Sequence, residues 1–482
     1  MATHTGELTQ RSALSLARAI ADREVSSREV VERHIEVLRR ADVNAVVVER
    51  FDEALEEADA ADERVAEGND LPPLLGVPFT IKESIAVAGL PNSAGLMSRK
   101  DRPAEETAPA AQRLLDAGPI LLGLTNLSEL TMWIESNNRV YGRTVNAYDR
   151  RRTAGGSSGG EGAAVGCGGS PIGIGTDFAG SIRLPAFFNG VFGHKPSRGL
   201  VPFTGHFPTS DGEAMGMSVL GPLARRAEDL GAVMGLIAGP DGSDRFVTGD
   251  VEFGDPDDVG IEGLDVVISE GATYLPVSRE LREARERAAG ALAASGAKLR
   301  RENMRSVRRA VELFLAAAQE GAGVSLAELI VSEGGEPVTW RTALRRDNPH
   351  TPATLLTLAS ERAGEHTPER RIRKARAAAR SLESEIEATI GDGVLLHPPH
   401  PRVAPRHGWT VGRPWLLAPT ALFNLLGMPA TQVPLGLGRK GLPVGVQVAA
   451  AQGNDHVTIA VAMELERSLG GWVPPRNVNE GL

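Results

Sequence analysis

The chain has 482 residues, with 52 Lys or Arg against 62 Asp or Glu, and a formal net charge of −10. This acidic balance, without a basic tract, argues against nucleic acid as the main partner. The single cysteine, Cys167, excludes an intramolecular disulfide framework and cysteine-based metal clusters, which is typical of a reducing cytosol. Since the opening residues MATHTGELTQRS hold no apolar run, we expect no secretory signal peptide and a cytoplasmic location.

The N-terminal third is expected to consist of helices that lead into a sheet. Ser26 and Glu29 have the spacing of a capping box, which predicts a helix reaching to about Ala41. Further helices are predicted at Asp52–Glu67 and Thr107–Ala117, and strands at Asn44–Val48, Leu74–Ile81 and Ile120–Leu124. The second of these strands leads directly into Lys82.

A glycine-rich segment follows, from Thr153 to Gly180, and only Glu161 and Asp177 are charged in it. Such a composition is also typical of a flexible linker. The apolar runs Ala163–Val165 and Ile172–Ile174, however, indicate a small-residue helix and a buried strand. We therefore expect this segment to be an ordered part of the core.

Strands and helices alternate again after Phe207, which predicts an α/β protein. The expected strands are Asp265–Ser269, Lys298–Arg301, Val394–Leu396, Thr431–Pro434 and Val444–Val448, and the expected helices are Arg279–Ala294, a long one from about Pro368, and His456–Leu469. The uncharged stretch Ala418–Leu437 is the best membrane candidate. Because it carries three prolines and is barely long enough to span, we interpret it as buried strands and loops and expect no membrane span.

The glycine-rich segment permits three functional interpretations. Phosphate binding would require a G-x-G-x-x-G or G-x-x-x-x-G-K-[ST] pattern, and neither spacing is present. Gly155–Gly159 matches the G-x-S-x-G elbow of α/β hydrolases. The residues before it, YDRRRT, are too polar for the central strand that such an elbow must follow.

The third interpretation combines two serines with a lysine. Ser181 follows a strand through a tight Ala-Gly turn, where successive backbone N–H groups can point at one spot, as an oxyanion hole requires. Ser157 lies among glycines, whose backbone adopts conformations closed to other residues. Lys82 follows an apolar strand, so burial would lower its pKa toward that of a base. Taken alone, a lysine in this position is more often a core-edge lysine that pairs with a neighbour such as Glu83.

The stretch GGSSGGEGAAVGCGGSPIGIGTDFAGSIRLPAFFNGVFGHKPSRG resembles the signature block of the amidase signature family. The likeness extends upstream through GVPFTIKES, AGLPNSAG, GLTNLSEL and YGRTVNAYD, and downstream through GLPVGVQV. It weakens only between about residues 242 and 392. The resemblance implies the fold of that family, a large mixed and twisted β-sheet with helices on both faces.

The same resemblance implies one amidase domain over residues 1–482. Its catalytic core would be formed by residues of about 70–240 and 393–475, and a variable helical region on the substrate side by about 279–390. The implied reaction is hydrolysis of an amide C–N bond without a cofactor or metal. As partners we expect a small-molecule amide substrate and no nucleic acid, and a homodimer is left open.

By motif position, the resemblance implies a Ser–cis-Ser–Lys triad with Lys82 as base, Ser157 as the bridging serine on a cis peptide and Ser181 as nucleophile. The implied oxyanion donors are the backbone N–H groups of Phe178, Ala179, Gly180 and Ser181. The family pattern usually has Gly where Ala179 stands, so its methyl group could narrow the hole. Ser158 is expected to support the loop, and Asp177 and Arg183 to be structural partners.

The substrate is less defined. The C-terminal motifs are similar to those of fatty acid amide hydrolases, and aryl amides, esters or carbamates (a urethanase activity) are equally compatible with the triad. The alternatives are the A subunit of an aminoacyl-tRNA amidotransferase and a non-catalytic binding relative. By motif position, a substrate-binding segment is expected at Thr131, Met132, Trp133 and Ile134. The alternative there is a core helix opened by an Asn126/Glu129 capping box.

Two other sets of residues could carry chemistry. We interpret Cys167, among small residues, as a buried and inert thiol. His397 and His400, with His407 beyond, have the spacing of metal ligands. They lie in a proline-rich stretch, HPPHPRVAPRH, without a carboxylate, so we expect no metal site there.

Overall fold

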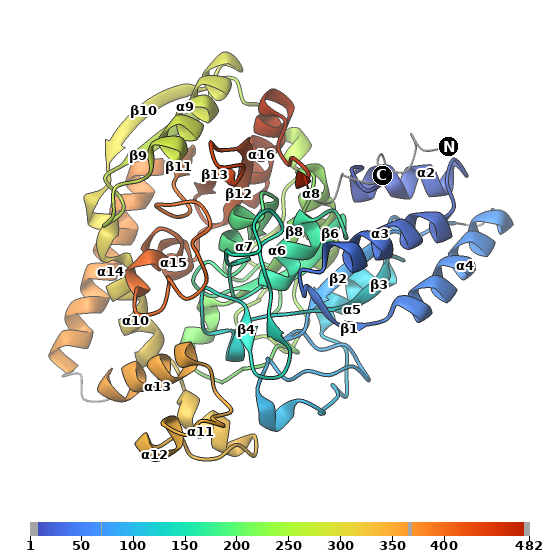
Figure 1. The fold of residues 1–482 in the computed structure, drawn as a ribbon. Coiled ribbons are helices and arrows are strands. Elements are labelled where there is room, and N and C mark those ends of the chain that lie inside the picture. Colours follow the sequence, from blue (N-terminus) through green and yellow to red (C-terminus); the bar gives the residue numbers. More distant parts are fainter. Residues whose placement is uncertain (1–7, 69, 365–368, 477–482) are drawn as a thin grey trace.

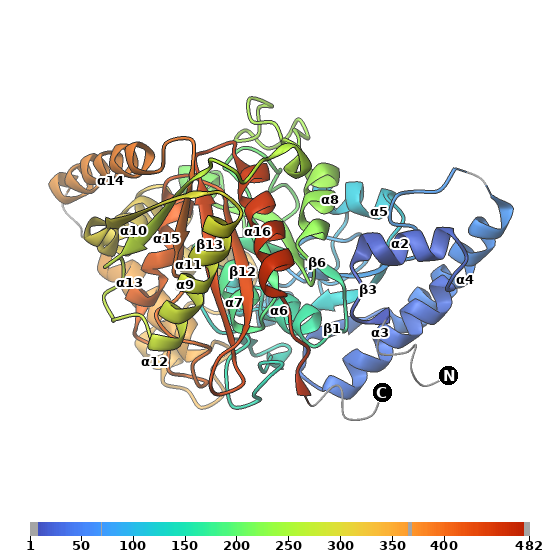
Figure 2. The same cartoon turned by 90° about the horizontal axis from the view of Figure 1, so that it is seen from above.

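The computed structural model describes residues 8–68, 70–364 and 369–476. Within these residues, eleven strands form one mixed sheet in the order β1-β3-β2-β6-β8-β7-β12-β13-β11-β9-β10. The sheet runs through the middle of the molecule, with helices in front of it and behind it (Figures 1 and 2). The strands are β1 (Val46–Glu49), β2 (Pro78–Lys82), β3 (Ile120–Thr125), β6 (Ile172–Asp177), β7 (Phe192–Lys195), β8 (Val219–Ala224), β9 (Asp265–Glu270), β10 (Lys298–Asn303), β11 (Val394–His397), β12 (Ala430–Leu437) and β13 (Pro443–Ala450).

The helices on the two faces can be assigned from alternating side chains. On β12, the Thr431 hydroxyl contacts His194 of β7 and Thr458 of a helix near the C-terminus. Gly193, which precedes His194 on β7, packs instead against Ala186 of a short helix. Because successive side chains of a strand point to opposite faces, these two helices cover opposite faces of the sheet. They are α16 (Asp455–Leu469) and α7 (Arg183–Phe188).

The remaining helices extend these two layers. α5 packs against α8, α8 against α16 and α16 against α9, while α6 packs against α7 on the other side. The ranges of these and of the other helices are α2 (Ala13–Ala21), α3 (Ser27–Ala41), α4 (Phe51–Glu67), α5 (Pro109–Asp116), α6 (Gly159–Gly166), α8 (Glu228–Ile237), α9 (Arg279–Ala294), α10 (Ala310–Glu320), α11 (Leu326–Ser332), α12 (Trp340–Ala343), α13 (Pro352–Gly364), α14 (Glu369–Ile390) and α15 (Ala418–Leu425).

Most predicted elements are present, and their ends have local causes. Ser26 accepts a hydrogen bond from the Glu29 N–H at the start of α3, and Gly68 ends α4 in the left-handed conformation. The expected helix start at Pro368 lies outside the described residues. The interpretation of Ala418–Leu437 as strands and loops is wrong in its first half, because Ala418–Leu425 is the helix α15.

Two central strands, β7 and β8, were not expected from the sequence. β7 contains His194 and Lys195, and β8 contains Gly221 and Pro222, which obscure a strand pattern. Both polar side chains of β7 are buried with partners: His194 bonds Thr431 and Asp455, and the Lys195 ammonium donates to the carbonyl of Met428. Tertiary contacts therefore override the local pattern.

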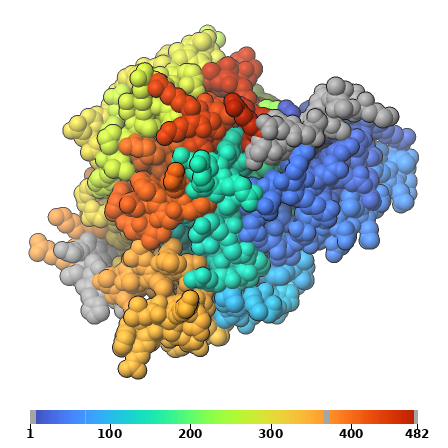
Figure 3. Space-filling model, in the orientation of Figure 1, coloured from blue at the N-terminus to red at the C-terminus, as the bar shows by residue number. Residues whose placement is uncertain are grey.

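Helices α11, α12 and α13 form a lobe at the lower left of Figure 1, coloured orange on the surface in Figure 3. The lobe packs on the core through Ile330 and Leu358, which form one hydrophobic cluster with Leu96, Leu130 and Phe207. Within the described ranges, no helix has both the length and the apolar character needed to cross a membrane.

Candidate active site

Lys82 lies at the end of β2 and is fully buried. Its Nζ is 2.6 Å from Ser157 Oγ and 2.7 Å from Thr176 Oγ1. Burial lowers the pKa of Lys82 to about 7, although Asp177, Glu161 and Glu83 oppose the shift. A lysine with this pKa is available as a neutral amine near pH 7, which is the form that can accept a proton.

The alternative partner, Glu83, forms no hydrogen bond or ion pair with Lys82 among the described residues. Its carboxylate accepts hydrogen bonds from the backbone N–H groups of Ser93 and Ala94 and from the hydroxyls of Ser93 and Tyr141. These four donors, rather than Lys82, hold the Glu83 carboxylate.

Ser157 lies in a loop that several backbone contacts hold in place. The Gly156–Ser157 peptide bond is cis, as the family resemblance implied. The Ser157 carbonyl accepts bonds from the Ser128 N–H and from the Ser136 hydroxyl. Ser158 supports the loop as expected, because its hydroxyl bonds both backbone groups of Thr176.

Ser181 lies in the turn between β6 and α7. The Ser158 N–H donates to the Ser181 carbonyl at 3.1 Å, so the loops that carry Ser157 and Ser181 are in contact. Among the described residues, no hydrogen bond joins Ser157 Oγ to Ser181 Oγ, the hydroxyl groups of the predicted bridging serine and the predicted nucleophile. Such bonds often tighten only when substrate binds. Ser181 and its neighbours Phe178 and Ala179 are partly exposed, whereas the strand before them is buried.

Asp177 and Arg183 shape this turn and are structural partners, as expected. They form a fully buried ion pair with 3.0 Å between Arg183 Nη2 and Asp177 Oδ1. The Asp177 carboxylate also accepts bonds from the N–H groups of Gly180 and Ile182. The Arg183 charge and these donors hold the pKa of Asp177 far below its usual range, against the effect of burial.

The expected oxyanion donors differ in their availability. The Gly180 N–H is engaged by Asp177, whereas the N–H groups of Ala179 and Ser181 donate to no atom of the described residues. On the other side of the turn, Thr420 donates to the Ala179 carbonyl and Asn424 to the Asp177 carbonyl. Because a carbonyl shares its peptide plane with the next residue's N–H, these bonds to α15 orient the N–H groups of Phe178 and Gly180 before any substrate arrives.

The segment Thr131–Ile134 adjoins the Ser157 loop. A Cβ atom added to Gly156 would lie 2.4 Å from the Trp133 carbonyl oxygen, so the two backbones are in direct contact. Thr131, Met132 and Trp133 are partly exposed, while Ile134 is buried in the core. The helix of the alternative interpretation is not formed, because Glu129–Thr131 is a single 3-10 turn and Leu130 and Thr131 have positive φ angles, although Met132 does pack against a core cluster.

Four residues of this region were missed at the sequence level: Thr176, Glu161, Thr420 and Asn424. Thr176 precedes Asp177 in the signature block. Its contact with Lys82 uses only its hydroxyl group, and a single threonine gives no distinctive sequence signal. Glu161 is one of two charged residues in a glycine-rich stretch, and this isolation could have marked it as a candidate functional residue. Thr420 and Asn424 lie some 240 residues from Ser181, and no local pattern connects them to it.

The other candidate residues, Cys167, His397 and His400, are buried away from the Lys82 and Ser157 contact. Cys167 is buried, and burial raises the pKa of its thiol to about 11. His397 bonds the Ser269 hydroxyl, and His400 bonds the Arg402 carbonyl. Burial lowers the pKa of these histidines to about 3 and about 4. In the described part of the chain, no group of three or more His, Cys, Asp or Glu side chains is arranged to hold a metal ion.

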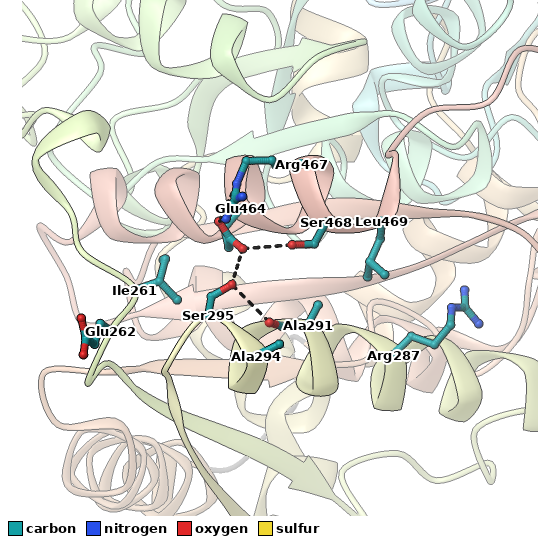
Figure 4. A pocket seen from close by; sticks show the side chains of 10 residues that line it. All are labelled: Ile261, Glu262, Arg287, Ala291, Ala294, Ser295, Glu464, Arg467, Ser468 and Leu469. Carbon is teal, nitrogen blue, oxygen red and sulfur yellow. Dashed lines mark hydrogen bonds and ion pairs between the residues drawn. The ribbon is translucent and has the colours of Figure 1, made fainter.

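A separate hollow of about 810 Å³ lies between α9 and α16 (Figure 4). Glu464 at its floor bonds Ser295 and Ser468, and Arg287 and Arg467 flank it. None of the residues predicted for the active site lines this hollow.

The fold defines an amide hydrolase architecture, and comparison with known proteins agrees. The family model described as Amidase matches residues 29–459. Human fatty-acid amide hydrolase 2 is 38% identical, over 98% of this chain and 91% of the relative. A bacterial aryl acylamidase of the amidase signature family superposes with a TM-score of 0.82 at 25% identity, over 95% of this chain and 96% of that one.

The chain therefore belongs to the amidase family, and it is an amide-hydrolysing enzyme. Its fold is the predicted one, a mixed α/β structure shared with other amidase signature enzymes. The A subunit of glutamyl-tRNA(Gln) amidotransferase from Methanosarcina acetivorans is a more distant relative, 29% identical over 92% of this chain and 94% of the relative.

Proposed function

We propose that this enzyme cleaves amides with an apolar acyl or aryl group through an acyl-enzyme on Ser181, with Ser157 as proton bridge and Lys82 as base. The observation that carries the proposal is the 2.6 Å contact between Lys82 Nζ and Ser157 Oγ in a fully buried setting. It couples a lysine of lowered pKa to a hydroxyl beside the partly exposed Ser181 turn.

The reaction follows from this arrangement. Lys82 accepts the Ser157 proton while Ser157 takes the proton of Ser181, whose Oγ forms a bond to the carbonyl carbon. The backbone N–H groups of Ala179 and Ser181 stabilise the oxyanion. Ser157 then donates its proton to the leaving nitrogen and recovers the proton held by Lys82. The C–N bond breaks, and the amine departs.

Water completes the cycle by the same relay. It loses a proton to Ser157 and Lys82 while its oxygen attacks the Ser181 ester, and the acid is released as Ser181 regains its proton. An ester or carbamate presents the same carbonyl group, so the proposal includes these substrates.

An apolar wall beside the turn supports the substrate class. Phe178 packs edge-to-face on Phe314 of α10, with 4.9 Å between ring centroids. Met217, Ala317 and Leu425 belong to the same cluster, which also includes Ala179. Glutamine, the donor of the amidotransferases, would need charged partners for its ammonium and carboxylate groups, whereas this wall suits an apolar acyl group.

The location and organisation are parts of the same proposal. A lone buried thiol and an acidic composition support a cytoplasmic location. One sheet that takes strands from both ends of the chain supports a single catalytic domain with a variable helical region at about residues 279–390.

Active-site labelling tests the nucleophile. A fluorophosphonate should add one label to the wild-type enzyme, and peptide mapping should find it on Ser181. Ser181→Ala should take up no label and lose about 10⁴-fold or more in kcat/KM on a chromogenic anilide, with an unchanged melting temperature. The control Ser295→Ala, in the distant hollow, should label and turn over normally. Labelling at Ser158 or Cys167 would contradict the proposal.

A further inference from the structure

Glu161 is a buried carboxyl group on the same face of the sheet as Lys82. The hydroxyl of Thr80 donates to Glu161 Oε2 at 2.7 Å, and the hydroxyl of Thr125 donates to Oε1 at 2.8 Å. Thr80 precedes Lys82 by two positions on β2, and Thr125 is the partner of Lys82 in the register of β2 and β3. Lys82 therefore points to the same side as both hydroxyls that hold Glu161.

The core has space for this carboxyl group because β6 has no side chain at the facing position. Gly173 pairs with Thr80, and a Cβ atom added to Gly173 would lie 1.8 Å from Glu161 Oε2. Glu161 belongs to the first turn of α6, directly after the Ser157 loop. The same end of α6 thus brings both Ser157 and Glu161 to Lys82.

The other charged or titratable groups that face Lys82 have partners of their own. Asp177 is paired with Arg183, and Glu83 receives bonds from four donors. The buried ring of His206 bonds the Pro208 carbonyl, and burial lowers its pKa to about 3, so it is neutral.

Glu161 differs from these groups, because its only donors among the described residues are two neutral hydroxyls and Lys82 is the cation that faces it. Burial raises the pKa of Glu161 well above its usual range, which the two threonines and the charge of Lys82 oppose.

We propose that Glu161, held by Thr80 and Thr125, is a positioning residue that sets the proton affinity of Lys82. The inference rests on the proposed role of Lys82 as base. As a carboxylate, Glu161 stabilises the Lys82 ammonium; as a neutral acid, it leaves Lys82 as the free amine that can accept the Ser157 proton. Because the charge of each buried group shifts the pKa of the other, the acid limb of the pH–rate profile belongs to both.

The pH dependence of kcat/KM for Glu161→Gln tests this inference. Glutamine keeps the size of the side chain and can accept from one threonine hydroxyl through its Oε1, with its Nε2 donating to the other, but it cannot become a carboxylate. Without the counter-charge, Lys82 loses its proton at lower pH, so the acid limb should move by about one pH unit toward acid. A purely structural role would lower activity or melting temperature and leave the limb in place.

Asp229→Asn is the matched control. Asp229 is also a buried carboxyl group of raised pKa, but it accepts its bonds from the N–H groups of Ala13 and Leu14 and does not face Lys82. Its loss should leave the acid limb at the wild-type position, whatever it does to stability.

Two further variants keep the test decisive. Thr125→Val removes one donor from the Glu161 carboxylate and should move the acid limb in the same direction. This variant covers the case in which Glu161→Gln does not fold.

In Lys82→Met, the acid limb of the fluorophosphonate labelling rate at Ser181 should vanish. If it persists there, the proposed function itself fails. If it vanishes there but stays at the wild-type position in both the Gln and the Val variants, only the role of Glu161 is overturned.

Discussion

The signature segment, Gly155–Gly199, and the lobe of α11 to α13 are held in place by different means. In the signature segment, backbones touch each other: Gly156 contacts the Trp133 carbonyl, and Gly162 contacts Pro185. The lobe is held by side chains, such as the Glu129 carboxylate, which bonds His350, Thr351 and Thr354. Its outer side exposes 70% of Trp340 and 80% of Leu344.

This difference has a consequence for substitution. Where backbones touch, even one methyl group displaces atoms that position the reacting groups. Where side chains lie on the surface, a substitution mainly changes contacts with water and leaves the positions of the reacting groups unaltered. The chemistry should therefore depend strongly on the first region and weakly on the exterior of the second.

After Ser181→Ala, the largest effect is expected for Lys82→Met. Loss of the base should reduce kcat/KM by about 10³-fold or more at neutral pH. In the wild-type enzyme, the base must be neutral and the pKa of Lys82 is about 7. Activity should therefore rise with pH through about 7 and fall about tenfold for each pH unit below it. A variant with a near-native rate at pH 7 would contradict the relay.

A large effect is also expected for Gly156→Ala. The added Cβ would lie 2.4 Å from the Trp133 carbonyl oxygen and 2.7 Å from the Glu135 backbone nitrogen, so the Ser157 loop must move. We expect a loss of about 10²-fold in kcat/KM, because small displacements of catalytic groups have effects of this size.

Gly235→Ala is the control for this variant. Gly235 lies in α8, and an added Cβ would meet no atom within 4 Å. Since alanine favours helices, this change should keep activity and raise stability by about 0.5 to 1 kcal/mol, measured by denaturant unfolding. Equal losses in the two variants would show that backbone contact is not what distinguishes the signature segment.

A moderate effect is expected for Trp133→Ala. Trp133 is partly exposed beside the Ser157 loop, and its indole N–H donates to the Thr410 hydroxyl. Its loss should change the ratio of kcat/KM for long-chain acyl amides to that for aryl amides by about tenfold, the range of small differences in apolar pocket contacts. A uniform loss over all substrates, with a lower melting temperature, would mean that Trp133 only packs the core.

The smallest effect is expected for Leu344→Ala on the outer side of the lobe. The side chain is 80% exposed, so the free energy of unfolding should change by less than about 0.5 kcal/mol. Its kcat/KM on small anilides should stay within about twofold of wild type. Leu358→Ala, at a buried position where the same lobe packs on the core, should cost about 2 to 5 kcal/mol and serves as the contrast. A large loss for Leu344→Ala would show that the outer side of the lobe takes part in catalysis.

Much of the fold follows from local patterns in the sequence. The helices α3, α4 and α9 and the strands β3, β9 and β11 have the predicted positions within a few residues, because apolar spacing and glycine stops are local properties. The α/β class follows from the alternation of these elements. The motifs around Lys82, Ser157 and Ser181 also identified the family before any contact was known.

Tertiary structure decided the features that depend on distant residues. The helix α15 lies in an uncharged stretch with three prolines, and its Thr420 and Asn424 reach the Ser181 turn only because β7 and β12 are neighbours in the sheet. The contact of Glu161 with Thr80 and Thr125 likewise requires α6 to pack over β2 and β3. Local sequence determines which element forms, whereas burial against a distant partner determines which polar groups meet and hence what charge each can hold.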